Sequence, residues 1–166
     1  SHVFSLGFMT ATSILVGEAL GADDLEGQKS VRITSHYVVL VASFPVLFAI
    51  YLFRSEIAAA YSIDGDTKTL WLQICVCVLL LKLLDDIAQA GQGFLVGLER
   101  TRVVFLGRFT GLWVVAMPTG YALSVYHSLS GYWIGWIMGT ALTLIWFVRA
   151  GSIYVKRQKP KLVVQE

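Results

Sequence analysis

The middle of the sequence carries the side chains with the clearest capacity for chemistry. Lys82, Asp85 and Asp86 lie inside the apolar stretch 70–98, which is long enough to cross a bilayer. A charge at membrane depth costs roughly 2.5 to 3.5 kcal/mol on insertion scales, so such side chains usually face a partner or a water-filled cavity. The pattern therefore predicts a pathway for an ion or a polar solute.

Polar residues continue along this stretch at helical spacing. Lys82, Asp85, Asp86, Gln89 and Gln92 fall at offsets of three, four and seven, which places them on one helix face. We expect the two aspartates, with Lys82, to bind a coupling cation or a proton, and the two glutamines to line a substrate cavity. Neutralising one aspartate would change its pairing with Lys82, and so the balance between two arrangements of the bundle.

A simpler interpretation of the same residues is a structural ion pair. Lys82 and Asp86 are four residues apart and can neutralise each other on a buried helix. That pairing leaves Asp85 without a partner in this chain, which favours the functional interpretation. Glu18 is a further candidate for ion coupling, although its place near the end of the first apolar segment gives it access to water.

Other reactive residue types give weaker signals. Cys75 and Cys77, two residues apart, point to different faces of a helix and are interpreted as packing residues, with no metal site. His2, His36 and His127 are scattered near the ends of apolar segments. The sequence contains no nucleophile elbow, Walker loop or zinc signature. We therefore expect no enzyme and no cofactor, with Na⁺ or H⁺ as the possible coupling ion.

The composition indicates the elements that must position these residues. Hydrophobic residues make up 56% of the chain and charged residues 14%, with a mean hydropathy of +0.68, whereas about one quarter of an ordinary soluble domain is charged. This predicts an all-α integral membrane protein with the lipid bilayer as its partner and no nucleic-acid role. Segments near the roughly 20 residues that a span needs predict five transmembrane helices, at residues 3–20, 37–53, 70–98, 109–125 and 132–148.

The linkers and glycines refine this arrangement. Gly21 is suited to end a helix and the Asp pair after it to cap the next one, while residues 54–69 predict a short interfacial helix followed by a tight turn. We interpret 99–108 as a basic linker. Gly131, Gly135 and Gly139 recur every fourth residue, which lets helix backbones approach closely. Residues 1–150 are expected to form the transmembrane bundle and 151–166 a basic cytoplasmic tail.

The distribution of basic residues predicts the orientation. With five spans, ten Lys and Arg residues fall on one side and only Arg54 and Lys68 on the other. The positive-inside rule makes the first side cytoplasmic, so the C-terminus of this multi-pass cell-membrane protein is expected inside. The ten are Lys29, Arg32, Arg100, Arg102, Arg108, Arg149, Lys156, Arg157, Lys159 and Lys161.

Several motifs, in order, resemble those of the multidrug and toxic compound extrusion (MATE) family. They are ATSILVGEALGADD (11–24), FRSEIAAAYSIDGDTK (53–68), FLVGLERTR (94–102), GLWVVAMPTGYALS (111–124) and SGYWIGWIMG (130–139). The chain departs from the family pattern at Glu18, where the family has Gln, and at Leu98-Glu99-Arg100, where it has Leu-Arg-Gly. Its usual acidic position on the third span falls on Gln89, one turn after Asp85.

The resemblance implies twelve transmembrane helices in two six-helix lobes around a central cavity. The chain would supply helices eight to twelve of the C-terminal lobe, with the N-terminal lobe as its missing partner. The implied activity is antiport, the export of amphipathic, often cationic organic compounds or drugs in exchange for sodium or protons. Two alternatives stay open: a lipid-linked oligosaccharide flippase or polysaccharide exporter of the same superfamily, and a structural subunit of a membrane complex.

Overall fold

The chain folds into helices joined by short turns. A computed structural model describes the backbone of residues 2–162 and the side chains of 5–126 and 129–155. Within this part of the chain the regular structure is entirely helical, as the sequence predicts. The elements are α1 (His2–Gly21), α2 (Leu25–Leu52), α3 (Arg54–Ala60), α4 (Gly65–Gly97), α5 (Thr101–Phe109), the π-helix η1 (Thr110–Ala116) and α6 (Met117–Leu162).

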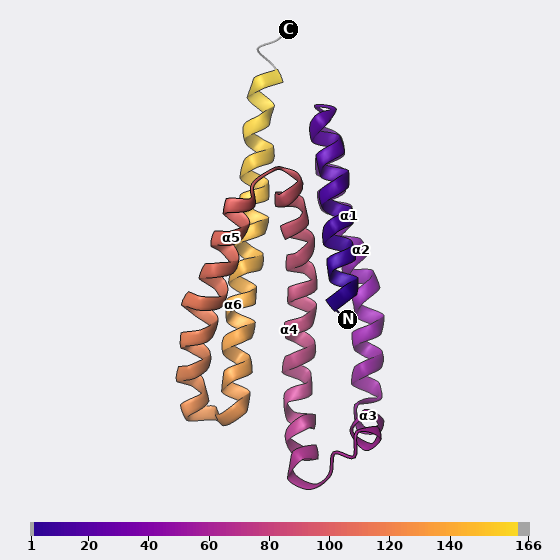
Figure 1. Cartoon of the computed structure of the whole chain (residues 1–166), viewed down its shortest axis with the longest axis vertical. Coiled ribbons are helices and arrows are strands. Elements are labelled where there is room, and N and C mark those ends of the chain that lie inside the picture. The colour runs from indigo at the N-terminus through magenta and orange to yellow at the C-terminus, as the bar shows by residue number, and fades with distance from the viewer. Residues whose placement is uncertain (1, 163–166) are drawn as a thin grey trace.

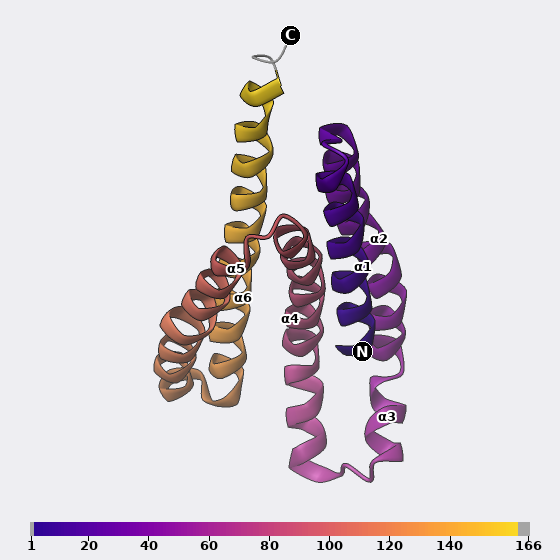
Figure 2. The same ribbon diagram turned by 45° about the horizontal axis from the view of Figure 1, so that its top comes forward.

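Helix α4 occupies the centre of the bundle. It contacts α1 and α2 on one side, and α5 and α6 on the other. Figures 1 and 2 show the same order from two directions, with the short α3 below the lower end of α2. Because α4 has helices on both sides, its polar side chains face protein more than lipid.

The chain reverses direction within α6 and forms a helical hairpin. Its first arm is Thr101–Tyr126 and its second arm is Leu129–Val155, and Figure 1 shows the bend at the lower end of α5 and α6. Three glycines of the second arm lie against backbone of the first, where an added Cβ would overlap: Gly131 against Leu123, Gly135 against Gly120, and Gly139 against Gly111. The four-residue glycine spacing thus lies at the contact between the arms.

The membrane-spanning elements follow the predicted order with three shifted boundaries, one of which is the end of the last span, at Val155 instead of 148. By length and composition, three helices of the described chain can cross a membrane: Leu25–Leu52, Thr101–Tyr126 and Leu129–Val155. The first and third predicted spans are not among the three, and the first corresponds to the shorter apolar helix Ser5–Gly21. The second span begins at Leu25 instead of 37, and the fourth at Thr101 instead of 109. Polar residues such as Gln28, which is buried, continue these helices beyond the apolar core, so hydropathy alone placed both starts too late.

Two predicted turn features are present. Helix α1 ends at Gly21, and Asp24 caps α2 because its carboxylate accepts a hydrogen bond of 2.8 Å from the Gly27 amide. The short helix predicted after the second span is α3. The chain enters α4 at its first residue, Gly65, whose φ of +59° favours glycine. These turns fix where α2 and α4 begin.

Helix α6 runs through the predicted boundary at residue 150 without interruption. Val155 is buried and packs with Val16, Phe94 and Leu98, so the start of the expected tail joins α1 to α4. A second apolar cluster, Ala88, Leu95, Val104 and Phe147, joins α4 to the hairpin. The side chains of the remaining basic tail, residues 156–166, lie outside the described part.

Candidate ion-pair and cavity site

One ion pair of α4 faces α1. Lys82 Nζ pairs with Asp86 Oδ1, and the Ser5 hydroxyl donates to the same carboxylate oxygen. Lys82 Nζ also lies 2.8 Å from Ser5 Oγ. The exposed fraction is only 6% for the Asp86 side chain and 19% for Lys82. This is the self-neutralising pair that the four-residue spacing allows, tied to a second helix by Ser5.

The other aspartate is also paired, which corrects the expectation that Asp85 has no partner in the chain. Arg108 Nη1 donates to Asp85 Oδ1 at 2.8 Å, and Arg108 Nε donates to Gln92 Oε1 at 2.9 Å. The assignment of 99–108 to a linker was therefore wrong. Helix α5 begins at Thr101 and carries Arg108 about two turns into the bundle.

Adjacent residues on a helix point about 100° apart, and this separates the two aspartates. Asp86 turns toward α1, whereas Asp85 turns toward the hairpin. Gln92 contacts both sides, since its Nε2 also lies 3.2 Å from the sulfur of Met9 on α1. The polar stripe of α4 is thus divided into two ion pairs whose formal charges cancel.

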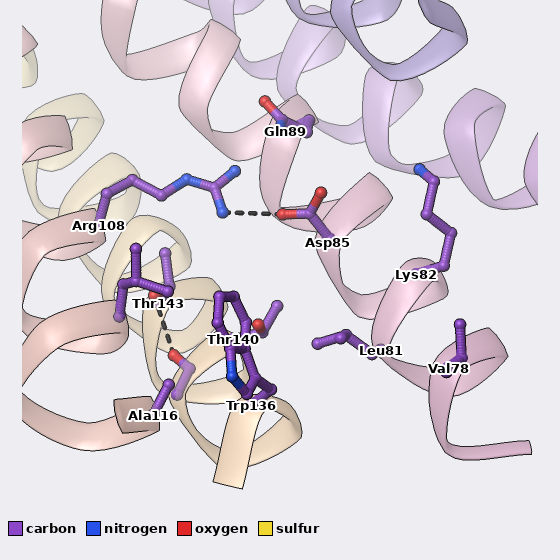
Figure 3. Close-up of a pocket in the computed structure, with 12 residues that line it drawn as sticks. Val78, Leu81, Lys82, Asp85, Gln89, Arg108, Ala116, Trp136, Thr140 and Thr143 are labelled. Atoms are coloured by element: carbon purple, nitrogen blue, oxygen red, sulfur yellow. Dashed lines mark hydrogen bonds and ion pairs between the residues drawn. The ribbon is translucent and has the colours of Figure 1, made fainter. Parts of the chain in front are cut away.

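The Asp85–Arg108 pair borders a cavity of about 380 Å³ between α4 and the hairpin. Figure 3 shows Arg108 and Asp85 reaching toward each other from facing helices. Both side chains are partly exposed: the exposed fraction is 31% for Arg108 and 23% for Asp85. The cavity is lined by Val78, Leu81, Lys82, Asp85, Gln89, Arg108, Leu112, Ala116, Trp136, Gly139, Thr140 and Thr143.

Three polar atoms of this lining are buried without a hydrogen-bond partner in the described chain. They are Gln89 Oε1, Arg108 Nη2 and Trp136 Nε1. Buried polar groups in proteins are nearly always satisfied, so these three atoms mark places where the described chain leaves a hydrogen bond unmade. Of the two predicted cavity glutamines, Gln89 lines this cavity, while Gln92 orients Arg108 from outside the lining.

A second cavity, of about 330 Å³, lies between α1, α2 and α4. Its walls are mostly apolar, and Asp86 and Ser43 provide its polar groups. Asp86 is already engaged there by Lys82 and Ser5. Glu18 is exposed near the end of α1 and is not among the residues that line either cavity.

The described residues contain no group of three or more His, Cys, Asp and Glu side chains placed to hold an ion. Cys75 is buried and Cys77 partly so, both as free thiols. Arg108 is the site residue that sequence reasoning missed. The position of Arg108 could have indicated a role in the site, because Arg108 lies inside the fourth span when that span is extended back to Thr101.

Comparison with known families identifies this arrangement of helices. The family model MatE matches residues 1–122. The chain belongs to the MatE family. The family resemblance drawn from the motifs is thereby confirmed.

The names of several relatives of this MatE chain refer to drug resistance. Multidrug resistance protein MdtK of Proteus mirabilis is 31% identical over 163 residues, which cover 90% of this chain and 35% of that protein. Probable multidrug resistance protein NorM of Bacillus subtilis is 30% identical over 142 residues, covering 84% of this chain and 31% of that protein. The chain spans about a third of the length of these relatives.

A solved structure shares the fold. It is an outward-facing conformation of a multidrug resistance MATE family transporter, with a TM-score of 0.84 and 19% sequence identity. The alignment covers 94% of this chain and 36% of the solved chain. The order and packing of the MatE helices are therefore those of a known membrane transporter.

Proposed function

We propose that this chain is part of the C-terminal lobe of a cation-coupled antiporter that exports amphipathic, often cationic organic compounds, and that it is not an enzyme. Sodium or a proton is the coupling ion. The observation that carries the proposal is the Asp85–Arg108 pair at a cavity inside the bundle. The drug-resistance names of the relatives support the substrate class.

Asp85 is the coupling residue in this proposal because its ion pair is the more accessible one. Its carboxylate is 23% exposed and accepts from Arg108, while that of Asp86 is 6% exposed and held by both Lys82 and Ser5. An incoming cation or proton reaches Asp85 through the cavity. Lys82 and Asp86 then fix α4 against α1, and Glu18 stays at the water-facing helix end.

Binding of a cation or proton at Asp85 changes the contacts of Arg108 and can switch the bundle between two arrangements. When a cation or proton neutralises the carboxylate, Arg108 loses its ionic partner and keeps its hydrogen bond to Gln92 and its place over the Phe147 ring. The contact between α4 and the first arm of the hairpin then weakens. Two arrangements of the helices with different affinity for the ion give the alternation that antiport needs.

The proposal includes partners and orientation. The opposing lobe would close the central pathway against this chain, and the bilayer would cover the exposed apolar faces. The C-terminus lies in the cytoplasm by the positive-inside rule. With Arg108 inside the bundle, nine of the thirteen basic residues are on that side, and Arg54 and Lys68 on the other.

Replacing each ion pair by neutral side chains of similar shape tests the assignment. In the full polypeptide that contains this chain, Asp85→Asn with Arg108→Gln should abolish sodium- or proton-driven dye efflux from proteoliposomes. Lys82→Gln with Asp86→Asn is the matched control, also neutral overall, and should retain most of it. Equal losses in both double variants at equal folded yield would rule out a special role for Asp85.

The flippase alternative gains one observation, a second base inside the bundle. Arg108 joins Lys82 there, and basic side chains are what a phosphate-bearing substrate needs. Each base is already paired with an aspartate, however, so the four charges cancel. The drug antiporter stays the better supported function.

A further inference from the structure

The second cavity, between α1, α2 and α4, is lined by a carboxylate that the bundle uses on one side only. Lys82 Nζ and the Ser5 hydroxyl both bind Oδ1 of Asp86. No group of the described chain donates to Asp86 Oδ2, and unlike Gln89 Oε1 this oxygen is accessible to solvent. A carboxylate has about four acceptor positions, so Oδ2 can accept a hydrogen bond from a molecule in the cavity.

Helix α2 contributes a hydroxyl to the same cavity. Serines inside helices often donate back to a carbonyl one turn earlier, as Ser152 does to Val148 at 2.8 Å. Ser43 lines the cavity and makes no such bond within the described chain. Its hydroxyl can donate and accept. Asp86 and Ser43 therefore offer an acceptor and a donor to one space from two different helices.

The rest of the cavity suits an apolar molecule of modest size. Its volume of about 330 Å³ lies at the lower end of the range of small-molecule sites. Figures 1 and 2 show α1 and α2 together on one side of α4, with the hairpin on the other, so this cavity is separate from the one at Asp85. The apolar side chains of its wall are Phe8, Ala42, Val46, Leu47 and Ile50.

The charge of the lining indicates a neutral ligand. Among the described residues that line the cavity, Asp86 is the charged one, and Lys82 already balances it. A cationic ligand would leave one positive charge in excess and an anionic ligand one negative charge. Burying an uncompensated charge among apolar walls is costly. A neutral group that donates a hydrogen bond keeps the charges balanced.

We propose that this cavity binds a neutral, hydroxyl-bearing organic molecule with an apolar body. The ligand O–H donates to Asp86 Oδ2, the ligand oxygen accepts from the Ser43 hydroxyl, and the apolar walls enclose the body. The inference goes beyond the proposed function and does not rest on it, because the site lies apart from Asp85 and binding is measured without transport.

Three probes with the same aromatic body test the ligand class. The full polypeptide that contains this chain is purified in detergent and titrated by calorimetry with 2-naphthylmethanol, its methyl ether and 2-naphthylmethylammonium. Ala42→Phe fills the cavity, so binding at this site is the binding that this variant loses. Ala49→Phe is the matched control: Ala49 is exposed on the same helix outside the lining, and its variant should keep that binding.

At this site the alcohol should bind at least tenfold more tightly than the ether, which cannot donate to the carboxylate. It should also bind more tightly than the ammonium probe, whose charge has no counter-charge there. Ether or ammonium binding as tight as that of the alcohol would overturn the inference. Alcohol binding that Ala42→Phe leaves unchanged would overturn it as well.

Two serines of α2 provide a milder pair of variants. Ser43→Ala removes one neutral hydrogen bond, so the alcohol should bind about threefold more weakly. Ser30 also makes no hydrogen bond within the described chain, but it lines a different cavity, between α1 and α2. Ser30→Ala should leave alcohol binding unchanged. Equal effects of the two variants would contradict the role of Ser43.

A double variant tests the acceptor. Lys82→Met with Asp86→Leu removes the carboxylate together with its counter-charge, so no unpaired charge remains. The alcohol and the ether should then bind equally well, because only the apolar walls are left to hold them. A tenfold preference for the alcohol that persists in this double variant, with its helix content unchanged by circular dichroism, would overturn the inference.

Discussion

The two aspartates of α4 are neighbours in sequence but have different environments. Asp86 is buried with Lys82 and Ser5, whereas Asp85 shares the edge of a cavity with Arg108. Removing one member of a buried pair leaves an uncompensated charge, while removing both is much less harmful. The stability of α4 in the bundle therefore depends most on the Lys82–Asp86 pair.

Lys82→Met should destabilise the protein by about 3 to 5 kcal/mol, because Asp86 then stays charged and buried without its cation. The double variant Lys82→Met with Asp86→Leu should recover most of the loss. Thermal unfolding in detergent, followed by circular dichroism, measures both. A double variant as unstable as the single one would show that the pair is not a unit.

The sequence revealed one of these pairs and hid the other. Lys82 and Asp86 are four residues apart, so helical periodicity alone brings them together. Asp85 and Arg108 are 23 residues apart and meet only because the chain turns between α4 and α5 and α5 starts at Thr101. Hydropathy placed that start at 109, since the basic residues before it lower the local average. The unpaired N–H of Trp136 was equally invisible, as it depends on which face turns inward.

At the scale of elements, close backbone contact holds the hairpin together. The first arm changes from α5 through the π-helix η1 to α6, and Pro118, whose ring crowds the preceding turn, is the second residue after η1. The Thr119 hydroxyl donates to the Val115 carbonyl at 2.6 Å beside this irregular stretch. The glycine spacing of the second arm could be predicted to pack, but its partner surface could not.

Gly135→Ala should separate the arms, because the new Cβ would overlap the backbone at Gly120. We expect a loss of about 1 to 3 kcal/mol, typical of overpacking. Gly7→Ala is the control: no atom lies within 4 Å of its added Cβ, and alanine favours a helix interior by up to about 1 kcal/mol. Unfolding temperatures of the two variants provide the measurement. A Gly135 variant as stable as the Gly7 variant would contradict the tight contact.

At the scale of the whole molecule, the order of helices and the two ends of the bundle could be predicted from the sequence. Turn residues and apolar segments indicated α1, α2 and α4 in order. Because each of these helices crosses the bundle, successive linkers were expected at opposite ends. The apolar residues that stay exposed, such as Ile33, Tyr37 and Phe44 on α2, suit contact with lipid.

Cysteine labelling tests the orientation. Asp23 and Ser62 lie in turns at opposite ends of the bundle. Both are exposed and have similar backbone φ, 52° and 54°, so a cysteine should affect stability to the same extent at either position. With Cys75 and Cys77 replaced by alanine, an impermeant maleimide should label Ser62→Cys in intact cells. Asp23→Cys should react only after permeabilisation. The opposite pattern would place the C-terminus outside.

The central claim is that a cation or proton displaces Arg108 from Asp85. Solid-state NMR of the full polypeptide in lipid, with ¹⁵N-arginine and ¹³C-aspartate labels, reports this contact as a dipolar coupling between the Arg108 guanidinium and the Asp85 carboxyl carbon. The account predicts a strong coupling without the driving ion and its loss when that ion, sodium or proton, is supplied. A coupling that stays unchanged under every condition that drives efflux would contradict it.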